Sequence, residues 1–204
     1  MIAIIDYGVG NLFSLRGSLK KLGLDAVVTS EEKTIRECDR VILPGVGAFG
    51  DAAKKLADSG LDRVILEEAA KGKPLLGICL GMQLLFEKSY EYGEHRGLGL
   101  IPGRVVSLEE ALKGSLKVPH IGWNALRILK KDDPLLKYTV EGDAMYYVHS
   151  FYAADCEAYT LAVSDYGIPV TGAVRNGNVF GTQFHPEKSG NEGLQILKAF
   201  AEIG

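Results

Sequence analysis

Three times within its first 80 residues the chain repeats one pattern: a short apolar run, a glycine-bearing turn and a stretch of helical spacing. The apolar runs are residues 2–5, 41–43 and 74–78, and each has the length of a strand. We expect helices near residues 11–22, 51–58, 61–71 and 80–89. Strands that alternate with helices predict a parallel sheet, with a ligand site at the carboxyl ends of its strands.

From about residue 104 the sequence becomes rich in strand patterns, such as "RVVSL", "AMYYVHSFYAA" and "VTGAVRNGNVFGTQF". Asn176-Gly177-Asn178 is a hairpin signal, and "NEGLQILKAFAEI" predicts a final helix with Leu194, Leu197 and Ile203 on one face. The expected fold class is therefore α/β and flavodoxin-like: three layers, with a mostly parallel central sheet, flanking helices and an antiparallel extension. A chain of 204 residues fits one domain, 1–204.

Composition excludes several classes of partner. Charged residues make up 24% of the chain and the formal net charge is −3, which argues against a nucleic acid or an anionic membrane. No apolar run approaches the roughly 20 residues of a membrane span, and the N-terminus lacks the basic residues of a signal peptide, so we expect a cytoplasmic protein. Three widely spaced cysteines suit neither a disulfide framework nor a metal cluster. We expect no metal and no cofactor.

Cys79 stands in the glycine pattern of a strand-turn-helix elbow, "GICLG", at the position that a nucleophile occupies. Small residues two before and two after it permit a sharp, strained turn that pushes the side chain into a cleft. The adjoining helix N-terminus favours thiolate over thiol. The alternative is that Cys79 is simply a small buried residue at a strand end.

A nucleophilic cysteine requires a base, and the base requires a group that orients it. His185 and Glu187 flank Pro186 at the end of an apolar strand, and residues two apart in an extended segment project to the same side. His185 is therefore the expected base, although an incidental surface turn would have the same sequence. The other three histidines, at positions 95, 120 and 149, lack such a carboxylate and are interpreted as structural.

Acyl transfer also requires donors for an oxyanion. The candidates are the amide of Leu80, directly after the nucleophile, and an amide of Val46 or Gly47 in the loop "PGVG". The alternative for this loop is an ordinary strand-to-helix turn. A second glycine loop, "DYGVGN", lacks the third glycine of a dinucleotide-binding fingerprint, because position 13 is Phe, and we reject that interpretation.

Taken together, "PGVGAFGD", "GICLGMQLLFE", "PHIGWN", "YYVHSFY" and "FGTQFHPEKSG" resemble the class I glutamine amidotransferases in order and separation. The closest resemblance is to the glutaminase subunits of imidazole glycerol phosphate synthases, and it spans nearly the whole chain. It implies the fold of that class and hydrolysis of L-glutamine by a Cys79, His185 and Glu187 triad.

The resemblance also implies a set of substrate-binding residues. Gln83 and Glu91 would hold the substrate glutamine, and the backbone at Ser150 and Phe151 would receive its α-carboxylate. Because Tyr92 and Gly93 follow Glu91 where the family more often has glycine directly, Glu94 is an alternative to Glu91.

By the same resemblance the chain would form a heterodimer with a cyclase subunit of (β/α)8-barrel type, which would receive the ammonia for histidine biosynthesis. The implied interface residues are Asn11, Trp123, Tyr146 and Lys188. Three alternatives remain open from the sequence: the glutaminase of anthranilate, aminodeoxychorismate or pyridoxal phosphate synthesis, a cysteine-elbow protein of the peptidase type, and a non-catalytic binding module.

Overall fold

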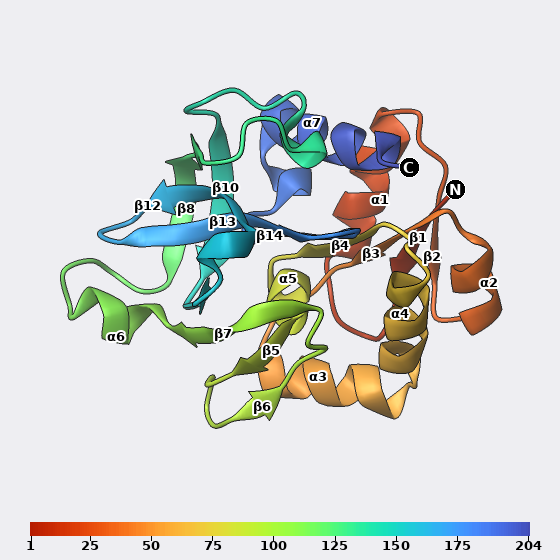
Figure 1. The fold of residues 1–204 in the computed structure, drawn as a ribbon, viewed down its shortest axis with the longest axis horizontal. Helices are drawn as coiled ribbons and strands as arrows, with labels where there is room; N and C mark the ends of the chain where they lie inside the picture. Colours follow the sequence, from red (N-terminus) through yellow and green to blue (C-terminus); the bar gives the residue numbers. More distant parts are fainter.

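An eight-stranded sheet forms the centre of the computed structural model, which describes residues 1–204 (Figure 1). The first five strands in its order run parallel and the last three are antiparallel, as the sequence predicts. The strands are, in order, β2 (Ala26–Thr29), β1 (Ile2–Ile5), β3 (Arg40–Leu43), β4 (Leu75–Ile78), β14 (Val179–Thr182), β13 (Pro169–Asn176), β12 (Thr160–Asp165) and β9 (Arg127–Ile128).

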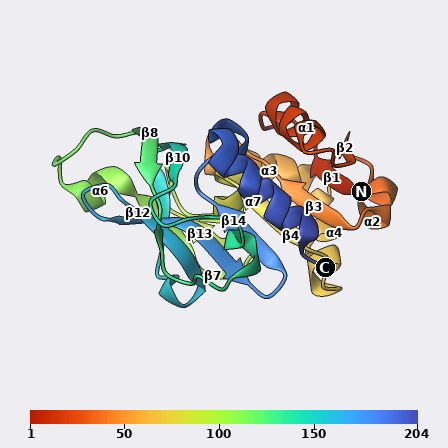
Figure 2. The same cartoon turned by 90° about the horizontal axis from the view of Figure 1, so that it is seen from above.

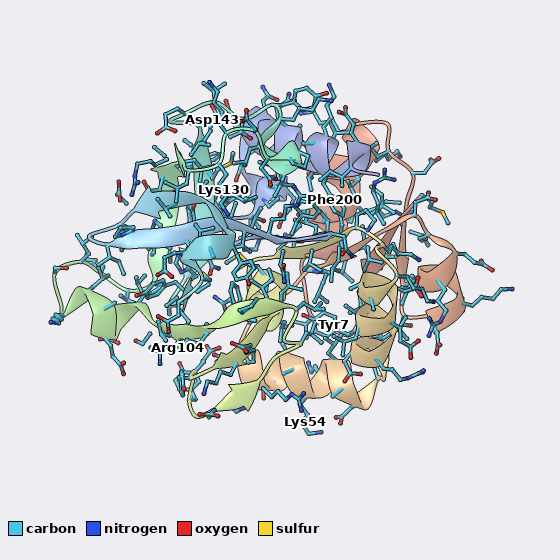
Figure 3. All side chains as sticks on the ribbon, in the orientation of Figure 1. Tyr7, Lys54, Arg104, Lys130, Asp143 and Phe200 are labelled. Carbon is cyan, nitrogen blue, oxygen red and sulfur yellow. The ribbon has the colours of Figure 1, made fainter.

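Helices cover both faces of this sheet (Figures 1 and 2). One face carries α1 (Leu12–Lys21) and α7 (Gly190–Glu202), and Figure 2 shows α7 lying over the central strands. The opposite face carries α2 (Glu32–Glu37), α3 (Phe49–Asp58), α4 (Leu61–Ala70) and α5 (Leu80–Leu84). Two apolar clusters result, one on each face, and Figure 3 labels Phe200 in one and Tyr7 in the other.

The parallel strands are buried on both sides, which explains why they read as continuous apolar runs. Along β1, Ile2 and Ile4 pack toward α1 and α7, whereas Ala3 and Ile5 pack toward the opposite helices. Each large aliphatic side chain buried in this way contributes about 1.5–3 kcal/mol. The two apolar clusters hold the strand ends, and the loops that follow them, in place.

Two smaller sheets complete the structure. One has four strands in the order β11-β7-β5-β6, and the other pairs β10 with β8. Their bounds are β5 (Phe86–Ser89), β6 (His95–Arg96), β7 (Ile101–Ser107), β8 (His120–Ala125), β10 (Ala144–His149) and β11 (Phe151–Ala154), with the short α6 (Leu108–Leu112) after β7. Single-turn 3-10 helices are η1 (Pro134–Leu136), η2 (Glu157–Tyr159) and η3 (Pro186–Lys188).

The helix expected over residues 80–89 is wrong beyond residue 84. Residues 86–89 form β5, which pairs with β7 and β6. Leu84, Leu85 and Phe86 are all fully buried, so an apolar run that fits a helix in isolation gains more by joining a sheet here. The elbow helix is therefore only five residues long.

The buried face of α7 and the elements β2 and α2 differ from expectation, whereas the hairpin agrees with it. In α7 the buried side chains are mainly Ile196, Leu197 and Phe200, while Leu194 is half-buried and Ile203 lies after the helix. Strand β2 and helix α2 were not predicted from the sequence. The hairpin is confirmed, because β13 and β14 pair across a two-residue loop at residues 177–178. No helix has the length and apolar character that a membrane crossing requires.

Candidate active site

The elbow at Cys79 has the strained backbone that its glycines predict. Cys79 follows β4 with φ 54° and ψ −111°, a conformation that costs a non-glycine residue about 1–3 kcal/mol. A Cβ atom on Gly81 would lie 1.9 Å from the carbonyl oxygen of Leu43, and one on Gly77 would lie 2.6 Å from that of Gly81. Glycine is therefore required at both positions, and the turn presents Cys79 at the strand end.

The carboxyl end of β14 lies beside this elbow. The Cys79 amide donates a hydrogen bond to the carbonyl of Thr182 at 2.7 Å. Three residues beyond Thr182, the His185 amide donates to the carbonyl of Tyr146 at 2.9 Å. The sheet thereby brings Cys79 and His185, which are distant in sequence, to the rim of one cavity.

His185 is oriented by Glu187. The Nδ1 atom of His185 lies 2.8 Å from Oε1 of Glu187, and both side chains are buried. Because a carboxylate accepts, Nδ1 carries a proton, so in the neutral ring the lone pair is on Nε2, which has no hydrogen-bond partner. His185 has the extended backbone expected before Pro186 (φ −96°, ψ 99°), but Glu187 lies in η3, so the contact closes across a tight turn and does not run along an extended segment.

Opposing effects set the charge of His185. Burial disfavours the imidazolium, but the nearby Cys79 thiolate and Glu187 carboxylate attract it and together raise its pKa to about 9. Once Cys79 has lost its proton, an imidazolium is therefore the stable partner. His185 is thus suited to take a proton and to return it.

The loop "PGVG" lies opposite the elbow. The Tyr7 hydroxyl donates to the carbonyl of Pro44 at 2.8 Å, and burial raises the pKa of Tyr7, so this hydroxyl stays neutral and can donate. Gly47 has φ 94°, and a Cβ on Gly45 would lie 2.8 Å from the amide nitrogen of Gly81. The loop is consequently packed directly against the start of α5. Leu80 is the first residue of that helix, so its amide has no intrahelical acceptor.

The expected substrate-binding residues lie around the same cavity. Gln83 donates from Nε2 to the carbonyl of Phe151 at 2.9 Å. Glu91 accepts from the Phe49 amide at 2.6 Å and faces the cavity, whereas Glu94 is mostly exposed and lies 3.7 Å from Lys88. The geometry therefore favours Glu91 over the alternative Glu94.

The cavity has a volume of about 450 Å³, which suits a ligand of amino-acid size. Ten of the residues singled out from the sequence line it: Val46, Gly47, Cys79, Leu80, Gln83, Glu91, Ser150, Phe151, His185 and Lys188. Glu187 does not line the cavity, since it contacts His185 at Nδ1. No group of three or more His, Cys, Asp or Glu side chains is placed to hold a metal ion.

Of the expected interface residues, Lys188 lines the cavity and the other three lie near Lys188 or near His185. Trp123 is 55% exposed and packs edge-on against Tyr146 with ring centroids 6.0 Å apart. Lys188 lies over the Tyr146 ring at 6.0 Å from its centroid. Asn11 caps α1 by accepting from the Ser14 amide, and with Val46 it lines a small recess next to His185.

Several residues of the site were not predicted from the sequence. Pro119, Val148 and His149 also line the cavity. His149 and His120 form a buried histidine pair whose rings are joined at 3.0 Å. Burial lowers the pKa of His120 to about 4 and that of His149 to about 3, so both are neutral near pH 7.

Gln183 is the other omission. It is fully buried, it lies directly after β14, and its side chain contacts both Cys79 and Gln83. The available signal was a polar residue inside the apolar run "VFGTQF", since such residues are rarely buried without a specific partner.

Comparison with known proteins identifies the family of this chain. Residues 3–203 match the family model described as glutamine amidotransferase class-I. A solved structure described as a glutamine amidotransferase shares the fold, with a TM-score of 0.77, 18% identity, and coverage of 99% of this chain and 98% of that one. Fold and family match together define the class: a class I glutamine amidotransferase.

Relatives of higher sequence identity show which family within this class the chain belongs to. The imidazole glycerol phosphate synthase subunit HisH of Wolinella succinogenes is 52% identical, with 100% of both chains covered. The HisH subunit of Bacillus cereus is 54% identical, with 100% of this chain and 95% of that one covered. The chain belongs to the HisH family of imidazole glycerol phosphate synthase subunits.

Proposed function

We propose that this chain, as the glutaminase subunit of an imidazole glycerol phosphate synthase, hydrolyses glutamine with Cys79 as nucleophile, His185 as base and Glu187 as the group that orients the base. The observation that carries the proposal is the unpaired Nε2 of buried His185, beside the strained elbow of Cys79 in a cavity of amino-acid size. Residues 1–204 act as a single domain.

The reaction begins when the Cys79 thiol gives its proton to Nε2 of His185. The thiolate attacks the carbon of the glutamine side-chain amide, and the carbonyl oxygen becomes an oxyanion. The amide of Leu80 and an amide of Val46 or Gly47 stabilise this oxyanion. Glu187 holds His185 in the required tautomer and stabilises the imidazolium.

His185 then returns the proton to the leaving nitrogen. The C–N bond breaks, ammonia leaves, and a γ-glutamyl thioester remains on Cys79. His185 next takes a proton from water, the hydroxide attacks the thioester, and glutamate departs as the thiol is restored. During both steps Glu91 binds the α-ammonium group of the substrate, Gln83 helps to hold the substrate, and the backbone of Ser150 and Phe151 receives its α-carboxylate.

The ammonia is delivered to a cyclase subunit of (β/α)8-barrel type in a heterodimer. The relatives carry the name of synthase subunits, which implies a partner. Trp123 and Ile121 are exposed apolar side chains on β8, the strand that follows the cavity-lining Pro119, and Phe13 is exposed on α1. Together with Asn11 and the group of Trp123, Tyr146 and Lys188, they form the surface that the cyclase covers. All three cysteines are free thiols, in agreement with a cytoplasmic location.

The "PGVG" loop also acts as the switch that couples the two subunits. Gly47 has a positive φ and no atom within 4 Å of its ideal Cβ position, so the peptide between Val46 and Gly47 can rotate at low steric cost. A ligand in the cyclase site favours the orientation in which an N–H points at the oxyanion.

The test is co-expression with the matching cyclase, followed by measurement of glutamate release as a function of cyclase ligand. We expect the isolated chain to be nearly inactive and the liganded complex to be active. Equal rates in both would contradict the coupling, and no glutamate release in either would contradict the proposed activity.

A further inference from the structure

Gln183 is placed by the sheet next to the proposed nucleophile. The backbone N–H of Gln183 donates to the carbonyl of Gly172 at 2.8 Å, which extends the β13–β14 pairing by one residue. The carbonyl of the preceding residue, Thr182, accepts from the backbone N–H of Cys79. The Gln183 side chain is fully buried, so its amide oxygen and nitrogen depend on protein partners.

The neighbours of Gln183 fix which end of its amide faces the sulfur. A backbone carbonyl only accepts, so the Gln83 atom 2.9 Å from the Phe151 carbonyl is the nitrogen. The second proton of that nitrogen is directed at Gln183, 3.1 Å away, where the contacted atom is therefore Oε1. The opposite end, Nε2, is left to donate to Sγ of Cys79 at 3.8 Å.

The sulfur has two polar contacts of opposite kind. As a thiol, Cys79 donates to the carbonyl of Val148 at 3.9 Å. When the proton moves to His185, that carbonyl has no proton to accept and faces a negative sulfur. The N–H of Gln183 is then the favourable contact, because a donor interacts more strongly with a charged acceptor than with a neutral one.

We propose that Gln183 is a further catalytic residue of this site: its side-chain amide donates to Cys79, stabilises the thiolate and fixes the direction of its lone pairs. The inference rests on the proposed function, in which Cys79 is the nucleophile. The link from Gln183 through Gln83 to the Phe151 carbonyl also ties the orientation of this donor to the segment proposed to receive the substrate α-carboxylate.

The experiment measures alkylation of Cys79 by iodoacetamide as a function of pH, with peptide mapping to separate Cys79 from the other two thiols. In Gln183→Met, a side chain of similar length replaces the amide. We expect the midpoint of the alkylation profile to rise by about one pH unit, so that at any pH below both midpoints alkylation slows about tenfold. Gln183→Asn withdraws the donor by one methylene, and its midpoint rises as well.

The matched control is Gln195→Met, which makes the same replacement on α7 at a half-buried residue of that helix. Its profile stays that of the unmodified protein. The inference is overturned if Gln183→Met and Gln183→Asn keep the original midpoint, or if Gln195→Met shifts it equally. Alkylation requires neither glutamine nor cyclase, so this result is separate from any failure of glutamate release.

Discussion

Replacement of Glu187 by Gln removes the charge that faces His185 while preserving the size of the side chain. In the structure the carboxylate lies 2.8 Å from Nδ1, and neither group is exposed. Burial alone lowers the pKa of the imidazole, whereas Cys79 and Glu187 raise it and prevail, giving a pKa of about 9 against an ordinary value of 6.5. That difference corresponds to roughly 3 kcal/mol of net stabilisation of the imidazolium, after the cost of burial.

Without Glu187 only Cys79 opposes burial. We expect the pKa of His185 in Glu187→Gln to fall by at least one pH unit and glutamine hydrolysis to fall about 10²-fold or more. Stability follows the same logic. Because the folded pKa lies above the unfolded one, the contribution of His185 is complete below pH 6.5 and is lost as the pH rises through 9. In Glu187→Gln we expect a smaller loss of unfolding free energy over this pH range.

The assay is NMR titration of the four histidines, combined with chemical denaturation at pH 6 and pH 9.5. In the unmodified protein we expect one imidazole to titrate near pH 9 and the buried histidine pair to titrate near pH 4 and pH 3. Glu192→Gln is the matched control, since Glu192 lies exposed in the first turn of α7. An unchanged high-pH titration in Glu187→Gln would refute the role of Glu187.

Three further outcomes follow from the structure. Gly81→Ala places a Cβ 1.9 Å from a backbone oxygen and should lower the free energy of unfolding by several kcal/mol, measured by thermal unfolding. The control Gly17→Ala lies at an exposed position in α1 and should raise the free energy of unfolding by about 0.5–1 kcal/mol. Equal effects of the two substitutions would contradict the close packing of the elbow. Glu91→Gln should raise the KM for glutamine at least tenfold and Glu94→Gln should not, and the reverse result would exchange their roles. For the buried histidine pair, the folded pKa lies below the unfolded one, so unfolding free energy should fall by several kcal/mol as the pH drops from 6.5 toward 3; a flat acid profile would show that the pair is not buried neutral.

The fold was largely predictable because its parallel strands are buried on both faces and their apolar runs end at glycines. The helix predicted at residues 86–89 is a strand in the structure, for a physical reason. "LLFEKS" continues the helical spacing of α5, but the partners that make it a strand, β7 and β6, lie further along the chain. A local pattern cannot report pairing that depends on residues elsewhere in the sequence.

Some residues of the candidate site were likewise predictable from local sequence and others were not. The Cys79 elbow was predictable because its requirement is local: glycines at positions 77 and 81 that the backbone needs. Gln183 was not, because its contacts with Cys79 and Gln83 arise where β4 and β14 end side by side. The choice of Glu91 over Glu94 likewise depended on contact with the first residue of α3.

The most direct test of the account is mass spectrometric mapping of the protein after reaction with an electrophilic glutamine analogue, in the presence of the cyclase and its ligand. We expect one adduct, on Cys79, which glutamine prevents by competition and which is absent from Cys79→Ala, a variant that should remain folded. An adduct on Cys38 or Cys156, or labelling that persists in Cys79→Ala, would contradict it.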